Sequence, residues 1–412
     1  MEFLKKHTWL VVVIAIILVM PQALTTHAIL NQKIILSGIA VDKESDIYEV
    51  TAQVILPKGG SQISGTGINI DFISEQGKTV GEAIQKIGYK MGKTVSLSHI
   101  NFIILGEGVM KDNIATDIDY FYRSASINVS AMILGCTGKG GDMIKKTQGL
   151  ETDIAVGLQK AFIYKQHDMN GIMTTMQEVY NSLYNPSQTI MISMIEFEMA
   201  KSSGGDAGTN SGGGASGTSR TDSENQQTTR IKYYNDIAIL KAGKVVSMLT
   251  QEDEILGVIL QSTKSKEGAI GFNNVEIENA DIGKLTLMIK NKRTKYKTYF
   301  ENGTPIFEIN IIIDKCLVSE IQIGTNNKEI YESTSNYLNE NLTKVATTAV
   351  TSYIYQAFKQ GKENDADILG IADKFSRLKA KEWQSYQSKL SNKNNYLNEV
   401  NIVVNLKIRQ GA

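Results

Sequence analysis

The feature that most constrains the fold is residues 77–136, where the spacing of the apolar side chains alternates between two periods. A helical period begins after Thr79 and Glu82, which have the spacing of a capping box, and it stops at Gly92. The run at 100–105 is short, continuous and apolar, which is typical of a strand buried on both faces. A helix followed by a buried strand is therefore predicted here.

The second half of this stretch repeats the same order. Apolar residues on one side of 109–121 predict a second helix. Apolar and polar residues then alternate over 127–133, which predicts a strand that ends before Gly135. The unit is thus helix, strand, helix, strand, and it contains no acidic pair spaced for acid-base catalysis.

The segment before this unit predicts a β-hairpin. Residues 34–41 and 47–56 are predicted strands joined by a polar turn, and apolar and polar side chains alternate along the second strand. We therefore expect one buried and one solvated face. After the unit, helical spacing over 154–162 and 172–183 predicts two amphipathic helices, and 189–199 predicts a strand.

A change of composition marks the next boundary. Residues 202–230 are mainly Gly, Ser, Thr, Asn and Asp without an apolar cluster, which predicts a flexible linker. Residues 233–249 predict a hairpin that turns on Ala242 and Gly243. A short helix follows at 250–259, and we assign the acidic residues of its first turn to capping rather than to catalysis.

The last third of the chain predicts helices on one face of an antiparallel sheet. A lysine-rich strand at 285–300 turns through Asn302 and Gly303 into an apolar strand at 306–313, and 400–408 alternates as a final strand. We favour the interpretation that the lysines protect a sheet edge from pairing, and contact with anionic headgroups is the alternative.

Two helices are predicted between these strands. The first is a long helix over 329–360, with Gly361 as its stop. The second starts at Asp365, and Trp383 lies beyond it. The residues that we expect this second helix to bury are Ile368, Ile371, Phe375 and Leu378.

The N-terminus has the three-part pattern of a secretory signal. Lys5 and Lys6 precede an apolar run at 9–20, and small residues lead to Ala28. The run has 12 residues, about 18 Å of helix, against about 30 Å of hydrocarbon in a bilayer. Cleavage after Ala28 is the favoured interpretation and an uncleaved signal anchor is the alternative. Both place the body of the protein outside the cytoplasm.

Composition limits the class of function. The 412 residues include 42% hydrophobic residues, enough for two or three domains with their own cores. Lys and Arg total 43, as do Asp and Glu, so the net charge is zero and nucleic acid is not an expected partner.

The chain has few of the residues that usually form zinc or nucleophilic sites. The four histidines are His7, His27, His99 and His167, and the two cysteines are Cys136 and Cys316. We expect buried free thiols and no zinc or nucleophilic site.

Two further patterns resemble sites only in part. Asp117 and Asp119 are two residues apart on a predicted helix and cannot face each other. The glycine-rich segment at 135–141 resembles a phosphate loop but lacks the Gly-Lys-Ser/Thr ending, so we predict a turn. We expect no catalytic residue, metal or cofactor, and the sequence does not identify partner-binding residues.

Six segments resemble motifs of the GerAC-like, or Ger(x)C, family, the C subunit of bacterial nutrient germinant receptors. They are residues 38–54, 77–84, 98–109, 120–127, 238–259 and 366–383. The resemblance covers nearly the whole chain after the leader. Members of the family are usually lipoproteins with a cysteine directly after the signal, whereas this sequence has no cysteine before Cys136. Attachment through the leader or through partners is therefore expected in place of a lipid.

The resemblance and the composition together predict an α+β fold with three mixed α/β domains, the C-terminal one an antiparallel sheet with long helices on one face. The expected division is a signal peptide or signal anchor at 1–28, an N-terminal germination-receptor-like domain at 29–201, a flexible linker at 202–230, a small middle domain at 231–283 and a GerAC-like C-terminal domain at 284–412.

The resemblance implies a function in spore germination. The chain would be a non-enzymatic subunit that assembles with two integral membrane subunits, of A type and B type, on the outer face of the spore inner membrane. A secreted hydrolase and a solute-binding protein of a transporter are the alternatives. The first would need a catalytic pair and the second two similar lobes, and neither pattern is found in the sequence.

Overall fold

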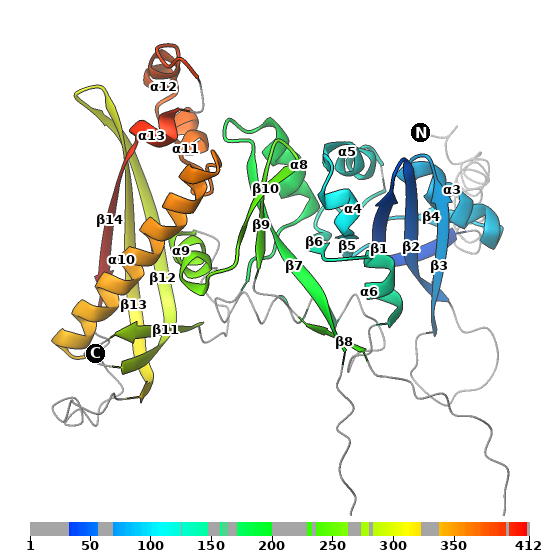
Figure 1. The fold of residues 1–412 in the computed structure, drawn as a ribbon, viewed down its shortest axis with the longest axis horizontal. Coiled ribbons are helices and arrows are strands. Elements are labelled where there is room, and N and C mark those ends of the chain that lie inside the picture. Colours follow the sequence, from blue (N-terminus) through cyan, green and yellow to red (C-terminus); the bar gives the residue numbers. More distant parts are fainter. Residues whose placement is uncertain are drawn as a thin grey trace, which may run out of the picture.

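Two β-sheets, next to each other along the long axis, form the framework of this computed structural model (Figure 1). The structure describes residues 33–56, 69–124, 126–146, 157–158, 160, 162, 171–199, 229–232, 236–262, 273–279, 283–322, 338–392 and 395–409. The expected leader and most of the expected linker lie outside these residues, as do His7, His27 and His167. No helix in the described ranges is long and apolar enough to cross a membrane.

The first sheet has ten strands in the part of the chain that the structure describes. They are β1 (Lys33–Glu44), β2 (Ile47–Leu56), β3 (Asn69–Gly77), β4 (Thr94–Ser96), β5 (Phe102–Leu105), β6 (Met132–Cys136), β7 (Thr189–Met199), β8 (Thr229–Lys232), β9 (Ile237–Lys241) and β10 (Lys244–Leu249). Strands β1, β5, β6 and β7 are parallel neighbours. Antiparallel strands extend this centre on both sides, through β2 and β3 next to β1 and through β9 and β10 next to β7.

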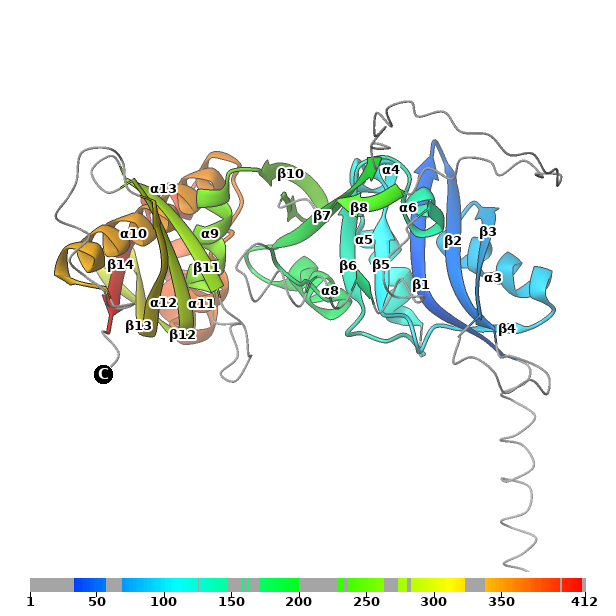
Figure 2. The same cartoon turned by 90° about the horizontal axis from the view of Figure 1, so that it is seen from below.

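Helices cover both faces of this sheet. One face carries α3 (Val80–Met91), α4 (Glu107–Met110), α5 (Ala115–Arg123) and α8 (Met176–Tyr184), and the other carries α6 (Gly140–Lys146) beside β1 and β2 (Figure 2). Side chains of β5 alternate between the two cores: Ile103 faces the α3 side and Phe102 the α6 side. The predicted strand buried on both faces is thus confirmed in β5.

The α3 helix begins and ends where the sequence predicts. The Thr79 hydroxyl accepts a hydrogen bond from the Glu82 N–H at 3.1 Å, and Gly92 ends the helix in the left-handed conformation. The reciprocal bond differs from that of a capping box, because the Glu82 carboxylate accepts from the N–H of Lys78 rather than of Thr79.

Several predictions for the first sheet and its helices were wrong. The helix expected over 172–183 begins only at Met176, because Thr175 caps it. The strand expected to end before Gly135 continues to Cys136.

Residues 127–131 are a loop and β6 begins only at Met132, because the Asn128 side chain bonds the Ile100 carbonyl and the Ser130 N–H instead of joining a ladder. The β1–β2 hairpin has no solvated face along its centre. Thr51 and Gln53 are buried, because α6 packs over them.

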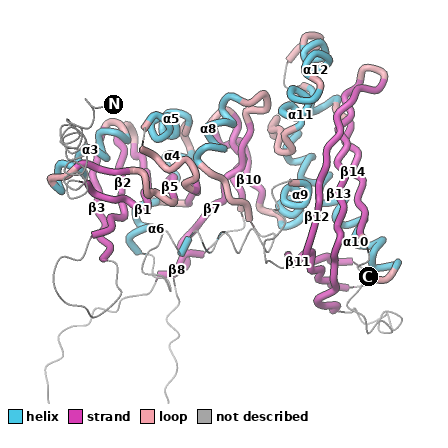
Figure 3. The backbone as a smooth tube through the Cα atoms, turned by 180° about the vertical axis from the view of Figure 1, so that it is seen from behind, coloured by secondary structure: helices cyan, strands magenta, loops and turns pink. Residues whose placement is uncertain are grey.

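The second sheet has four described strands in the order β11 (Asn273–Asn279), β12 (Gly283–Glu301), β13 (Thr304–Gln322) and β14 (Asn401–Ile408). Figure 3 shows the long β12–β13 hairpin, which turns at Asn302 and Gly303 as predicted. The helices are α9 (Glu252–Gln261), α10 (Glu340–Glu363), α11 (Ile371–Leu378), α12 (Ala380–Gln387) and α13 (Tyr396–Glu399). Their apolar residues form one core with the sheet.

This sheet and its helices differ from the expectation in four ways. The second helix begins at Ile371 rather than at Asp365, because Gly370 precedes it in the left-handed conformation. Strand β14 pairs parallel to β13, because the chain crosses over through the helices before it returns. The long helix begins at Glu340 with Asn339 as its cap, and it continues past Gly361. A Cβ on Gly361 would lie 2.6 Å from the Ala366 carbonyl, so this glycine permits a close approach and is not a stop. Leu378 is 60% exposed rather than buried.

Residues 231–283 contribute to both sheets. The β9–β10 hairpin turns at Ala242 and Gly243 as predicted, but it pairs with β7 in the first sheet. Helix α9 packs against α10, and β11 pairs with β12 in the second sheet. The division into three domains stays a proposal, and the structure shows how closely this middle segment joins the two sheets.

Candidate functional sites

Parallel strands β1, β5 and β6 end at one edge of the first sheet, which is where α/β proteins bind ligands. Asp42 lies at the end of β1, and the glycine-rich segment 135–141 includes the end of β6 and the start of α6. The Asp42 carboxylate accepts hydrogen bonds from the N–H groups of Gly140 at 2.7 Å and Gly141 at 2.8 Å. The chain's own carboxylate therefore occupies the place of a bound anion.

Glycine residues allow the carboxylates to come this close. A Cβ on Gly106 would lie 1.9 Å from Oδ1 of Asp42. The Glu107 carboxylate accepts a similar hydrogen bond, from the N–H of Gly138 at 3.1 Å. Gly138 has a φ of 81°, in the left-handed region that favours glycine. The prediction that this segment is a turn is confirmed.

Burial sets the electrostatics of this edge. It raises the pKa of Asp42, because the charged carboxylate loses water, and the bonds from Gly141 and Gly140 partly oppose this effect. Burial also raises the pKa of the Cys136 thiol. A thiol held in its protonated form is a poor nucleophile and a poor metal ligand.

The other candidate residues do not converge. Cys316 is a buried free thiol in the second sheet, and burial raises its pKa to about 12. His99 is exposed in the connection between β4 and β5. In the described ranges, no three His, Cys, Asp or Glu residues form a group that could hold a metal ion.

Asp117 and Asp119 have separate surroundings, as their spacing predicts. Asp119 binds Nε of Arg123 at 2.6 Å on the surface of α5. Asp117 is buried beside Tyr48, and burial raises its pKa to about 6 despite the hydrogen bond from Tyr48. Asp117 of α5 therefore contacts Tyr48 near the tip of the β1–β2 hairpin.

A polar junction connects the two sheets. The hydroxyl of Ser187, just before β7, donates to the Asp373 carboxylate of α11 at 3.0 Å, and the Ser187 N–H donates to the same carboxylate at 3.0 Å. Lys241 of β9 pairs with the Asp365 carboxylate at 2.5 Å. These contacts join the first sheet to the connection between α10 and α11.

Asp367 is the centre of this junction. Its carboxylate is buried and accepts bonds from the N–H groups of Ile371 at 2.8 Å and Ala372 at 2.7 Å, and from the Tyr396 hydroxyl at 2.9 Å. Its own N–H donates to the Thr189 hydroxyl at 3.2 Å. No role was predicted for Asp367, because the usual capping residue directly precedes the helix, whereas Asp367 lies four positions before Ile371.

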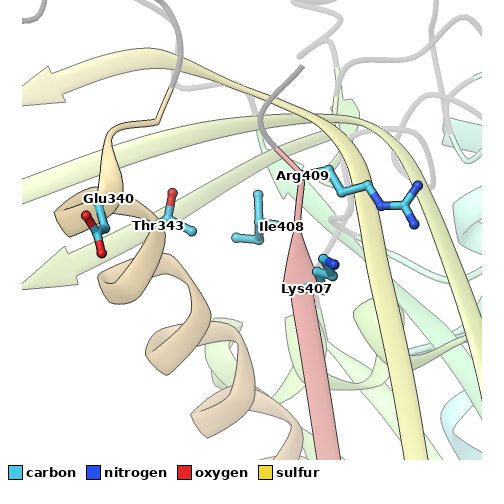
Figure 4. A pocket seen from close by; sticks show the side chains of 5 residues that line it. All are labelled: Glu340, Thr343, Lys407, Ile408 and Arg409. Carbon is cyan, nitrogen blue, oxygen red and sulfur yellow. The ribbon is translucent and has the colours of Figure 1, made fainter. Parts of the chain in front are cut away.

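An open groove of about 580 Å³ lies between the start of α10 and the end of β14 (Figure 4). It is lined by Glu340, Thr343, Lys407, Ile408 and Arg409. Ile408 points toward α10, whereas Arg409 points away from that helix. The lining contains one carboxylate, no thiol and no imidazole, so it does not hold a catalytic pair.

The fold and these contacts define a two-sheet α+β protein whose candidate ligand edge is closed by its own carboxylates. Residues 27–197 match the family model described as "Spore germination protein N-terminal domain". Residues 235–411 match that described as "Spore germination B3/ GerAC like, C-terminal". The chain belongs to the GerAC-like family of spore germination proteins.

Individual relatives share this relationship at low identity. The chain is 23% identical to spore germination protein B3 of Bacillus subtilis (strain 168) over 66% of this chain and 65% of that protein, just under two thirds of its length. It is 19% identical to spore germination protein KC of the same organism over 85% of this chain and 82% of that protein. A crystal structure of the GerBC protein aligns over 90% of this chain and 96% of that chain, with a TM-score of 0.49 and 18% identity.

Proposed function

We propose that this chain is a non-enzymatic subunit of a nutrient germinant receptor. The observation that carries the proposal is the closure of the parallel-strand edge, where Asp42 and Glu107 occupy the backbone N–H groups that a ligand would use. A chain that matches both halves of a germination family and closes this edge is best suited to assembly with partners.

The proposed partners are two integral membrane subunits, of A type and B type, and the proposed location is the extracytoplasmic face of the spore inner membrane. The two cysteines lie at strand positions and are buried, which does not suit attachment of a lipid at either thiol. We therefore assign membrane attachment to the leader or to the partners. Carbonate washing of membranes that contain the full chain, with sequencing of its N-terminus, distinguishes these two routes.

Deletion of the gene tests the proposal. Spores that lack this chain should lose their response to at least one nutrient, and an intact copy of the gene should restore it. A normal response to every nutrient that triggers the parent spores would contradict the proposal. The same two strains also test the secreted-hydrolase alternative. Equal hydrolytic activity in their culture media would exclude it.

A further inference from the structure

The face of the second sheet that points away from its helices carries an excess of cations. Apolar residues of β14, such as Leu406 and Ile408, pack against the core, so the residues that alternate with them point outward. We call the outward residues of β12 and β14 the cationic face. It consists of Arg293, Lys295, Lys297, Lys407 and Arg409, all exposed.

Lys292 points to the opposite side of the sheet from the cationic face. Lys292 is 6% exposed, and its ammonium group donates to the Ser262 carbonyl at the end of α9 at 2.6 Å. Burial lowers its pKa to about 8. Lys292 therefore binds the C-terminal end of α9, whereas Arg293, Lys295 and Lys297 face the solvent.

Two carboxylates of β13 lie between the cations. Glu308 binds Lys297 at 3.0 Å, and Asp314 binds Arg293 at 2.7 Å and Arg409 at 3.2 Å. Five cations thus face two carboxylates, an excess of three positive charges, in a chain whose net charge is zero. Glu301 lies beyond this set, at the hairpin turn.

The excess charge is spread across the sheet. Arg293, Ile312 and Lys407 lie in one row over three neighbouring strands. Lys295 and Lys407 pair with no carboxylate among the residues that the structure describes. Their charges are therefore available to a partner.

Protection of sheet edges explains only part of this pattern. Beyond Ile289, β12 has no described neighbour on the β11 side, and β14 is the other edge, so charges at both places would block pairing. Charges of either sign would prevent another strand from pairing with these edges. All the charged residues at 293–297 and 401–409 that point outward are nevertheless cations.

We propose that the cationic face lies against an anionic lipid surface. Lysine is depleted in the cores of protein interfaces, and the large apolar side chains exposed on this face are Tyr299 and Val403, each only 37% exposed. A face with unpaired lysines instead matches a surface of uniform negative charge, which attracts basic residues within a Debye length. The proposal rests on this charge pattern and not on the receptor role.

Vesicle sedimentation tests the proposal with the full chain. We compare vesicles of phosphatidylcholine with vesicles in which phosphatidylglycerol replaces part of it. Binding should be stronger to the anionic vesicles and should weaken as salt is added. The variant K295Q/K407Q should reduce the phosphatidylglycerol-dependent binding roughly 25-fold, because each of the two basic residues near such a surface adds about a fivefold effect.

The variant K93Q/K381Q is the matched control, since it removes two exposed lysines from other parts of the fold. It should bind as the unmodified chain does, and both variants should melt at the same temperature. All three chains carry the same leader, so its contribution cancels in the comparison. Equal binding of K295Q/K407Q and the unmodified chain would overturn the proposal, as would binding to an acidic protein but not to anionic vesicles.

Discussion

Buried carboxylates connect residues that are far apart in this chain. Asp42 binds backbone groups 98 and 99 positions away, and Asp367 receives the Tyr396 hydroxyl from 29 positions away. Burial disfavours the charge of each carboxylate, and the N–H and O–H donors offset part of that cost. Such residues stabilise the fold only while their donors remain in place.

Asp117 gives a pH dependence whose sign is defined. Its pKa is 3.8 in the ordinary environment and about 6 in the fold. Between these pH values the folded chain holds a proton that the unfolded chain has lost, so the free energy of unfolding decreases as pH rises. Asp117→Asn removes this loss. From about pH 4 to about pH 7 the variant should gain about 3 kcal/mol relative to the unmodified chain in urea unfolding.

Asp119→Asn is the control for this experiment, because it changes a carboxylate on the same helix that is paired with Arg123 at the surface. The gain expected for Asp117→Asn should be absent from this variant. If the unmodified chain and Asp117→Asn show the same pH dependence, the assignment of Asp117 as a dehydrated carboxyl group is wrong.

Among the elements, those defined by local signals were predicted well. Helix α3 follows from Thr79 and Gly92, and the turns at Ala242–Gly243 and Asn302–Gly303 follow from Gly243 and Gly303, which tolerate positive φ. Elements defined by distant partners were not. The parallel pairing of β14 depends on a crossover, and the first residue of β6 depends on a loop held by Asn128.

Helix α11 depends on Asp367. Asp367→Ala leaves the N–H groups of Ile371 and Ala372 and the Tyr396 hydroxyl without their acceptor. Each unpaired buried group costs about 1–3 kcal/mol, so the free energy of unfolding should fall by about 4 kcal/mol in urea titration. Asp365→Asn is the control, because asparagine also tolerates the positive φ of 53° at this position. The Asp365 carboxylate is 58% exposed and pairs with Lys241, so loss of its charge should cost less than about 1 kcal/mol. Equal losses for the two variants would contradict this role of Asp367.

At the scale of the whole molecule, the sequence indicated the α+β class and the family, but not the junction of the sheets. The contacts of Ser187 with Asp373 and of Thr189 with Asp367 join residues that are 186 and 178 positions apart. No local pattern marks such a pair. The closed parallel edge was partly foreseen, because 135–141 lacks the ending of a phosphate loop, but the part played by Asp42 was not.

A double-mutant cycle measures the strength of the junction. Ser187→Ala and Asp373→Ala each remove the bond between hydroxyl and carboxylate, so their combined effect on the free energy of unfolding should be smaller than the sum by about 1 kcal/mol. Ser187→Ala combined with Asp314→Ala, in a separate part of the fold, should add within about 0.5 kcal/mol. Additive effects in the first cycle would show that the two sheets do not depend on this contact.

The central proposal is that this chain assembles with membrane subunits. The most direct measurement is affinity purification of the tagged full chain from spore membranes after mild solubilisation, followed by identification of the proteins recovered with it. The proposal predicts two integral membrane proteins, absent from a control purification of untagged spores. Recovery of the chain without any integral membrane protein would contradict it.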